Sequence, residues 1–164
     1  MWSDGGMSHQ VEVSRTIAAS PERVYAMVSD LPRMGEWSPE NTGGKWMKGA
    51  TGPAVGAVFQ GTNTLGKRKW KTVSKVTCAD AGSEFAFDVT AAGMKVAGWG
   101  FTIVAADEPG TAKVTHWWDD HRNPVIAKFT GLALGVKDRA AHNRANMTQT
   151  LDRLADAAAA TTAS

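Results

Sequence analysis

Side chains that can ligate a metal or move protons are concentrated in one run, residues 116–121 (HWWDDH). On a β-strand, His116 and Asp120 share a face but lie about 13 Å apart, whereas Asp119 and His121 point to the opposite face. The ligands of a zinc ion must converge within about 2.0–2.2 Å of it. One ion therefore cannot bind all four, and we expect no metal site here but a strand end whose polar residues meet solvent.

His116 alone remains a candidate for acid–base chemistry. Its strand face also carries Val114 and Trp118, so an inward orientation would place the imidazole in a pocket. There it could act as a general acid or base. The alternative is a histidine packed at the edge of a core and satisfied by one hydrogen bond. A shift of one residue along the strand would place Trp117 inward and His116 in water, and the adjacent aromatic residues leave that register open.

Three other polar residues fall on surfaces that otherwise look apolar: Asn63 and Thr72 in the strands, and Arg144 on the inward stripe of the C-terminal helix. Groups of this kind orient the carbonyl or carboxylate of a ligand inside an apolar pocket. They can equally pair with each other or extend to the pocket rim. Both interpretations remain open from the sequence.

The scaffold that would position these residues is rich in β-strands. An alternating pattern over residues 11–17 predicts a strand with one buried face, on which Arg15 requires either a bulge or a partner. Residues 20–22 (SPE) open a short helix with a serine N-cap and a proline in the first turn, and a second short helix or turn runs to Trp37. Six strands then form an antiparallel meander, because short turns join only antiparallel neighbours. We expect these strands near residues 43–48, 56–63, 68–79, 83–91, 95–105 and 112–120.

The pattern becomes helical from Pro124. An unbroken helix to Ala160 would be about 55 Å long at 1.5 Å per residue, whereas a nine-residue strand covers only about 30 Å. Gly131 and Gly135 offer a break, so we predict a short element before Val136 and a long helix from there to about residue 157. One face of the long helix is formed by Ala140, Arg144, Met147, Leu151, Leu154 and Ala158.

One face of the predicted sheet is strongly aromatic, and the opposite face carries charged residues suited to solvent. Only one long amphipathic helix is available to cover the aromatic face, and a bent sheet wrapped around a single helix can leave a void. Gly61, Gly98 and Gly100 lie inside strands, which indicates bends or the close approach of a ligand. Bulky, flat side chains suit a pocket for an apolar molecule. The residues predicted to line it are Trp37, Phe59, Asn63, Trp70, Thr72, Phe85, Phe87, Trp99, Phe101, Trp118, Arg144, Met147 and Leu151.

Length and composition fit one globular domain in a chain of 164 residues. We expect a disordered leader at 1–8, a single domain at 9–157 and a frayed tail at 158–164. The net charge of +2 does not indicate nucleic acid, and the basic residues are scattered except within residues 67–71. The single cysteine excludes an intramolecular disulfide. No apolar run is long enough to span a membrane and there is no signal-peptide pattern, so we expect a cytoplasmic protein, monomeric by default and without a cofactor.

Several segments together resemble a known superfamily. Residues 17–25 (IAASPERVY), Asp30 and residues 37–39 (WSP) resemble the opening of the START/birch-pollen-allergen superfamily, also called SRPBCC. Residues 55–63 (VGAVFQGTN) and 110–115 (GTAKVT) resemble its polyketide cyclase/dehydrase branch, and the resemblance covers nearly the whole chain. It implies a helix-grip fold with a cavity for lipids, polyketides or other hydrophobic small molecules. It does not imply one reaction, because the branch includes binding proteins and a few cyclases.

These observations predict an α+β helix-grip domain: a seven-stranded curved antiparallel sheet wrapped around a long C-terminal helix, with two short helices after the first strand. Its predicted function is to bind, and thereby carry or sequester, a hydrophobic small molecule. One alternative is an aromatase/cyclase-type enzyme in which His116 is the acid or base and Asn63 or Arg144 polarises a carbonyl. The other is a protein-interaction module whose pocket mouth accepts an apolar side chain of a partner, with a closed core and an exposed apolar patch.

Overall fold

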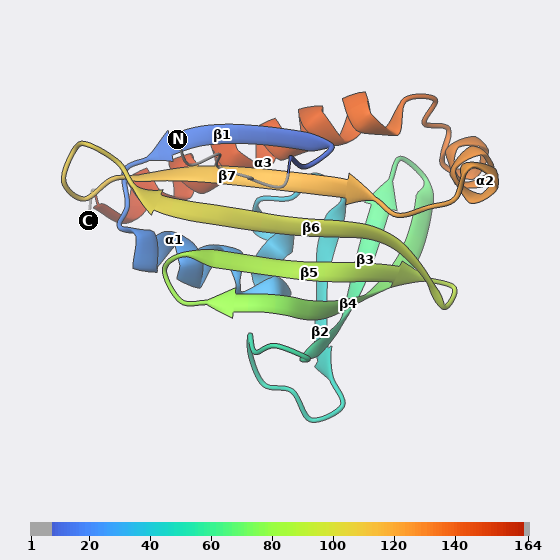
Figure 1. Cartoon of the computed structure of the whole chain (residues 1–164), viewed down its shortest axis with the longest axis horizontal. Helices are drawn as coiled ribbons and strands as arrows, with labels where there is room; N and C mark the ends of the chain where they lie inside the picture. Colours follow the sequence, from blue (N-terminus) through green and yellow to red (C-terminus); the bar gives the residue numbers. More distant parts are fainter. Residues whose placement is uncertain (1–7, 163–164) are drawn as a thin grey trace, which may run out of the picture.

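The computed structural model describes residues 8–162, and its strands form one antiparallel sheet that curves around the C-terminal helix (Figure 1). The strand order is β1-β7-β6-β5-β4-β3-β2, so the predicted meander is confirmed and β1 completes the sheet by pairing with β7. The elements in chain order are β1 (Val11–Ile17), α1 (Pro21–Val28), the 3-10 helix η1 (Leu31–Glu36), β2 (Asn41–Met47), β3 (Val58–Leu65), β4 (Arg68–Asp80), β5 (Glu84–Ala91), β6 (Met94–Ala105), β7 (Ala112–Asp120), α2 (Pro124–Leu134) and α3 (Arg139–Thr162).

The two C-terminal helices are separated by a residue in the left-handed region. The side chain of Asn123 caps the start of α2 by accepting a hydrogen bond of 2.8 Å from a backbone N–H of the first turn. Gly135 caps its end with φ of 71°, a conformation that suits glycine. The predicted break at Gly135 is therefore confirmed. Gly131 lies inside α2, and α3 starts at Arg139 rather than at Val136.

The two short helices after β1 cover one end of the sheet face on which α3 lies. α1 begins as predicted, with Ser20 as N-cap and Pro21 in the first turn, and the Ser20 Oγ accepts a hydrogen bond of 3.2 Å from the backbone. Val24 and Val28 are buried, and α1 contacts β5 and β6. η1 packs beside β2. This end of the sheet is thus closed by short helices as well as by α3.

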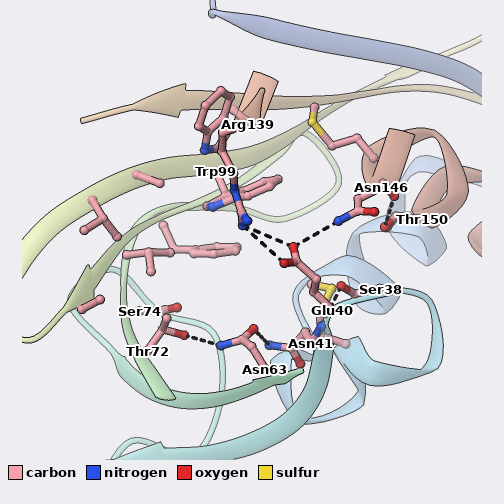
Figure 2. Close-up of a pocket in the computed structure, with 18 of the residues that line it drawn as sticks. Ser38, Glu40, Asn41, Asn63, Thr72, Ser74, Trp99, Arg139, Asn146 and Thr150 are labelled. Atoms are coloured by element: carbon pink, nitrogen blue, oxygen red, sulfur yellow. Dashed lines mark hydrogen bonds and ion pairs between the residues drawn. The ribbon is translucent and has the colours of Figure 1, made fainter. Parts of the chain in front are cut away.

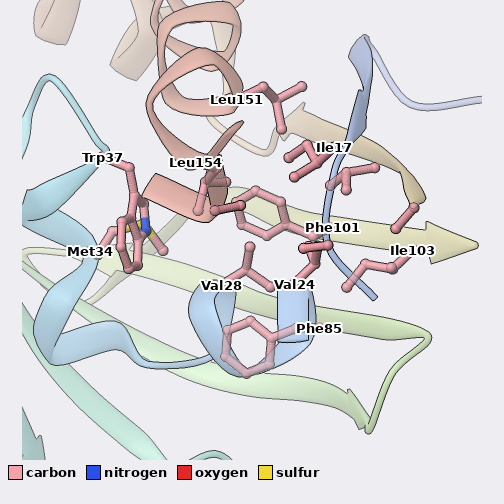
Figure 3. Packing of buried hydrophobic residues seen from close by; sticks show 14 of the residues in the cluster. Ile17, Val24, Val28, Met34, Trp37, Phe85, Phe101, Ile103, Leu151 and Leu154 are labelled. Carbon is pink, nitrogen blue, oxygen red and sulfur yellow. The ribbon is translucent and has the colours of Figure 1, made fainter. Parts of the chain in front are cut away.

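The apolar core joins these helices to the sheet (Figure 3). Phe85 is completely buried, and Leu151 and Leu154 of α3 belong to the same cluster. Trp37 and Phe59 complete this packing with 2% of their surface exposed. Four residues predicted to line a pocket, Trp37, Phe59, Phe85 and Leu151, therefore lie in the packed core, because α1, η1 and α3 fill the space at this end of the sheet.

β1 is held from both sides. Its register with β7 runs without a bulge from the pair Val11–Trp118 to the pair Ile17–Ala112. Arg15 therefore has a partner instead of a bulge: its guanidinium forms an ion pair with Asp152 of α3. α3 packs along β1 and also contacts β7, so the last helix fixes the strand that begins the domain.

The ends of the chain differ in part from expectation. α3 continues to Thr162, and Ala158 within it is fully buried, so residues 158–162 are helical where a frayed tail was expected. Residues 1–7 of the expected leader and residues 163–164 lie outside the described residues. None of the described helices is both long and apolar enough to cross a membrane.

Candidate functional site

A pocket of about 380 Å³ lies between the sheet and the first turns of α3 (Figure 2). Its wall is contributed by β2 to β7, by η1 and the segment that follows it, and by α3, with Ala133 of α2 at one side. Sites for small molecules have volumes of about 300–1,000 Å³. The cavity is therefore large enough for an organic ligand.

Aromatic side chains form one wall of the pocket. Phe87 of β5, Trp99 of β6 and Trp118 of β7 are paired across neighbouring strands, and the Trp99 and Trp118 rings lie 6.2 Å apart. Their convergence follows from strand geometry, because alternate residues share a face of the sheet. Of the residues predicted to line a pocket, the structure brings together Asn63, Trp70, Thr72, Phe87, Trp99, Phe101, Trp118 and Met147.

A row of polar side chains crosses β2, β3 and β4 at the pocket wall. The Asn63 Nδ2 donates to the Thr72 Oγ1 at 3.1 Å, and the Asn41 Nδ2 donates to the Asn63 Oδ1 at 3.5 Å (Figure 2). Gly61 leaves room for this row, since a Cβ there would stand 3.3 Å from both Asn41 and Thr72. Asn63 and Thr72 therefore pair with each other, and both also line the pocket.

The polar end of the pocket is built around Glu40, a residue that was not predicted. The Glu40 Oε2 lies 3.3 Å from the Arg139 Nη2 and accepts a hydrogen bond of 3.0 Å from the Asn146 Nδ2, while the His142 Nε2 lies 3.6 Å from the Oε1. The side chains of Glu40 and Arg139 are 13% and 20% exposed. We call these four residues the Glu40 cluster. It joins the residue before β2 to the first turns of α3 (Figure 2).

Arg139 has more hydrogen-bond donors than partners. Its Nη1 is buried and has no hydrogen-bond partner within residues 8–162. Burial lowers the pKa of Arg139, the charge of Glu40 opposes this shift, and the nearby charge of Arg122 adds to it. An arginine stays protonated at neutral pH, and a buried donor without an acceptor is unfavourable. The Glu40 cluster thus contains a buried N–H for which the described residues supply no acceptor.

His116 faces the pocket, which settles the register of β7. Its ring stacks on Phe101 with centroids 3.9 Å apart, and its Nδ1 lies 2.9 Å from the Gly100 carbonyl oxygen. Because a carbonyl only accepts hydrogen bonds, the Nδ1 carries the proton and the Nε2 is the unprotonated nitrogen. Burial lowers the pKa of His116 to about 4, against a smaller opposing effect of the Gly100 hydrogen bond. The imidazole is therefore neutral at neutral pH.

Side chains on the outer face of β6 and β7 account for two of the three glycines that lie inside strands. Trp117 lies over Gly100, where a Cβ would stand 2.3 Å from the indole ring. His9 stacks on the other side of that ring with centroids 3.9 Å apart. At Gly98, a Cβ would stand 3.6 Å from the same indole and 3.1 Å from His121. These glycines make room for protein side chains on the outer face of the sheet.

The acidic residues of the 116–121 run have partners within the protein. The Asp119 carboxylate lies 2.7 Å from the His9 Nδ1, and the Asp120 carboxylate binds Arg122 at 2.6 Å. Burial raises the pKa of each carboxyl, but the hydrogen bonds from these partners outweigh it and the net shift is downward. The end of β7 is therefore polar, as expected, and its two carboxylates are held by His9 and Arg122.

Arg144 is placed differently from expectation. It is exposed, and its Nη1 donates to the Glu12 carbonyl at the edge of the sheet. The buried side of α3 instead includes Asn143 and Thr150, with 0% and 3% exposed. Both are polar, so a search for an apolar stripe passes over them. The predicted inward orientation of Arg144 was wrong: α3 buries Met147, Leu151 and Leu154 of the same stripe, but near its start Asn143 takes the inward position instead.

Comparison with known proteins identifies relatives of the whole chain. A family model described as polyketide cyclase / dehydrase and lipid transport matches residues 8–159. A Polyketide_cyc-like protein of Corynebacterium glutamicum is 30% identical, with a TM-score of 0.60 over 88% of each chain. No curated protein matches the chain.

Two more distant structures share the fold. A START superfamily protein of Mycobacterium smegmatis is 18% identical, with a TM-score of 0.57 over 84% of this chain and 97% of that one. The di-domain ARO/CYC StfQ from the steffimycin biosynthetic pathway is 11% identical, with a TM-score of 0.63 over 91% of this chain and 44% of that one. The curved seven-stranded sheet around a long C-terminal helix is thus the helix-grip fold.

Proposed function

The chain belongs to the polyketide cyclase/dehydrase and lipid transport family, and we propose that it binds one hydrophobic small molecule in the pocket and carries or sequesters it. The observation behind this proposal is a cavity of about 380 Å³ with an aromatic wall and a distinct polar end. Small-molecule sites combine a mainly apolar lining with a few placed polar groups that orient the ligand.

The arrangement favours a ligand with an apolar body and one neutral polar end. The body would pack against Phe87, Trp99 and Trp118, and a carbonyl oxygen at the other end would lie beside the Arg139 guanidinium. A carboxylate fits less well, because Glu40 already places a negative charge beside the guanidinium. Like charges in a poorly solvated site repel each other. A ketone or alcohol therefore suits the polar end better than a free acid.

A cyclase-type activity is the second candidate, and the inward position of His116 favours it. The Nε2 is free of the hydrogen bond to Gly100 and is unprotonated in the neutral imidazole. A general base works best when its pKa lies near the operating pH, whereas burial lowers the pKa of His116 to about 4. His116 is thus a weak base, and this is the reason to rank binding above catalysis.

Filling the cavity tests the proposed binding function. Ala97 lines the pocket on β6 and is 7% exposed, whereas Val104 on the same strand is 52% exposed and does not line it. Ala97→Phe should weaken binding of a hydrophobic fluorophore by about tenfold or more, because the added ring occupies the ligand's volume. Val104→Phe is the matched control and should bind like the wild type.

The readout is a fluorescence titration with quenching of the pocket tryptophans, and circular dichroism verifies that both variants are folded. A folded Ala97→Phe protein that binds the fluorophore as tightly as the wild type would contradict the proposal. Native mass spectrometry and organic extraction of the purified wild-type protein then identify the natural ligand.

A further inference from the structure

The charges of the chain are unevenly distributed. Residues 41–79 and 121–137 contain no Asp or Glu. Because the whole chain has 18 Lys and Arg against 16 Asp and Glu, the rest of it carries a net negative charge. The basic residues of these two acid-free segments are Lys45, Lys48, Lys67, Arg68, Lys69, Lys71, Lys75, Arg122, Lys128 and Lys137.

The fold brings the two acid-free segments together. The first spans β2, β3 and β4, which are neighbours at one edge of the sheet, and the second contains α2. They meet where the tip of the β3–β4 hairpin lies beside the end of α2 (Figure 1), since a Cβ on Gly135 would stand 3.1 Å from the Arg68 Nη1. Lys67, Lys69 and Lys128 are exposed on these two elements. The hairpin tip and α2 therefore form one basic region of the molecule.

The same side exposes an apolar helix face. Val125, Phe129 and Leu132 of α2 are 73%, 76% and 73% exposed. Their spacing of four and three residues places them on one face of the helix. Contiguous exposed apolar side chains are uncommon on proteins that have no partner for them. α2 also contains Lys128 and no acidic residue, so its outer face is both apolar and basic.

The position of α2 links this surface to the pocket. Ala133, on the same helix, lines the cavity. Arg122, which precedes α2, and Arg139, which follows it, line the cavity as well. Ala133 lies one helical turn after Phe129 and beside Leu132, so the exposed apolar face of α2 adjoins the pocket at the C-terminal end of the helix. Anything that binds the outer face of α2 sits next to the pocket.

We propose that α2 and the β3–β4 hairpin form a docking surface for a membrane that contains anionic lipids. The apolar face of α2 inserts at the level of the headgroups, and the exposed lysines bind lipid phosphates. An interfacial helix of this kind gains affinity from buried apolar area and from attraction to anionic lipids together. A hydrophobic ligand would then pass between bilayer and pocket close to α2. The docking itself does not depend on what the pocket holds.

The positive charge of the surface favours an anionic membrane over a second copy of this chain. In a symmetric dimer formed through α2, the same basic patch would face its own copy, and like charges across an interface oppose association. An anionic bilayer satisfies both components at once, because it offers phosphates to the lysines and an apolar interior to Phe129. A second copy of the chain remains an outcome that the experiment separates.

Vesicle flotation tests the apolar part of the surface. The wild-type protein should bind vesicles that contain phosphatidylserine and should bind pure phosphatidylcholine vesicles at least about fivefold more weakly. Phe129→Ser should reduce binding to the anionic vesicles by about tenfold, because the largest exposed apolar side chain of the surface is lost. Val104→Ser, which removes an exposed apolar side chain on the outer face of β6, is the matched control and should leave binding unchanged.

A charge reversal tests the basic part. Lys69→Glu should weaken binding to the anionic vesicles by about fivefold or more and reduce its salt dependence. Lys113→Glu changes the net charge equally on β7, away from the surface, and should have little effect. Absence of wild-type binding, equal binding to both kinds of vesicle, or equal effects of the two Lys variants would overturn the proposal. A dimer in light scattering that Phe129→Ser dissociates would assign the helix face to a second copy instead.

Discussion

The two ends of the aromatic sheet face differ in what covers them. Phe85 and Phe87 lie on the same side of β5, yet Phe85 is fully buried in the core and Phe87 lines the pocket. Tyr25 of α1 contacts the edge of Phe85 at 6.3 Å between ring centroids, whereas the helix over the pocket presents Arg139 and Asn146. One strand pattern thus builds a packed core at one end and a cavity at the other, and the covering helices decide which.

The largest loss of stability is expected from a substitution at the packed end of the sheet. Phe85→Ala should lower the free energy of unfolding by about 3–5 kcal/mol, because it leaves a cavity in a closed core. Phe87→Ala, the same change at the pocket wall, should cost about 1 kcal/mol, because one side of that ring already faces a cavity. Urea denaturation followed by tryptophan fluorescence measures both. Equal losses would mean that the two ends do not differ in packing.

The next effect concerns His116 at the boundary between core and pocket. Burial lowers its pKa in the folded protein from 6.5 to about 4, so the unfolded chain binds the proton more readily. The corresponding stability is fully present above pH 6.5 and is lost as the pH falls to about 4, by about 3 kcal/mol in total.

A comparison of two histidine variants isolates this contribution. With His116→Gln the loss of stability between about pH 7 and pH 4 should be smaller than in the wild type, because the buried titrating group is gone. His121→Gln, which replaces an exposed histidine outside the pocket lining, is the control for the substitution itself. Parallel curves for the wild type and His116→Gln would show that the folded protein leaves His116 in contact with water.

The smallest effect is expected on ligand preference at the polar end of the pocket. Glu40→Gln keeps the shape of the Glu40 cluster but removes its negative charge, so affinity for a fatty acid should rise relative to a methyl ketone of equal length. We expect a change of about tenfold in this ratio, or about 1.4 kcal/mol. Glu36→Gln, at an exposed ion pair with Arg33, is the control. An unchanged ratio would contradict the proposed preference for a neutral ligand end.

Periodicity in the sequence predicts faces but not contacts between distant segments. Phe87, Trp99 and Trp118 were predicted from strand parity, because alternation on a strand has only two outcomes. Glu40 and Arg139 belong to no periodic pattern, and nothing in their local sequence indicates that they meet. Their contact depends on how the start of α3 sits over β2, which is a property of the tertiary packing.

The sequence also predicts only in part which face of the long helix α3 is buried. The stripe that includes Arg144 and Met147 has the correct period, yet Arg144 is exposed whereas Met147, Leu151 and Leu154 are buried. Asn143 takes an inward position beside Met147 despite being polar. A helix can rotate by a fraction of a turn at little cost in apolar burial, so the rotation is set by β1, against which α3 packs.

The pairing of β1 with β7 has a consequence for how the molecule forms. Ser14 and Thr115, which are hydrogen-bonded across these strands, are 101 positions apart. Closing so long a loop costs entropy before any contact offsets it, and sheets with such distant pairings fold in about milliseconds to seconds. During synthesis β1 leaves the ribosome first but has no neighbour until β7 follows. Because His116 and Trp118 of β7 and Met147 of α3 line the pocket, the ligand site is completed only when the last third of the chain has emerged.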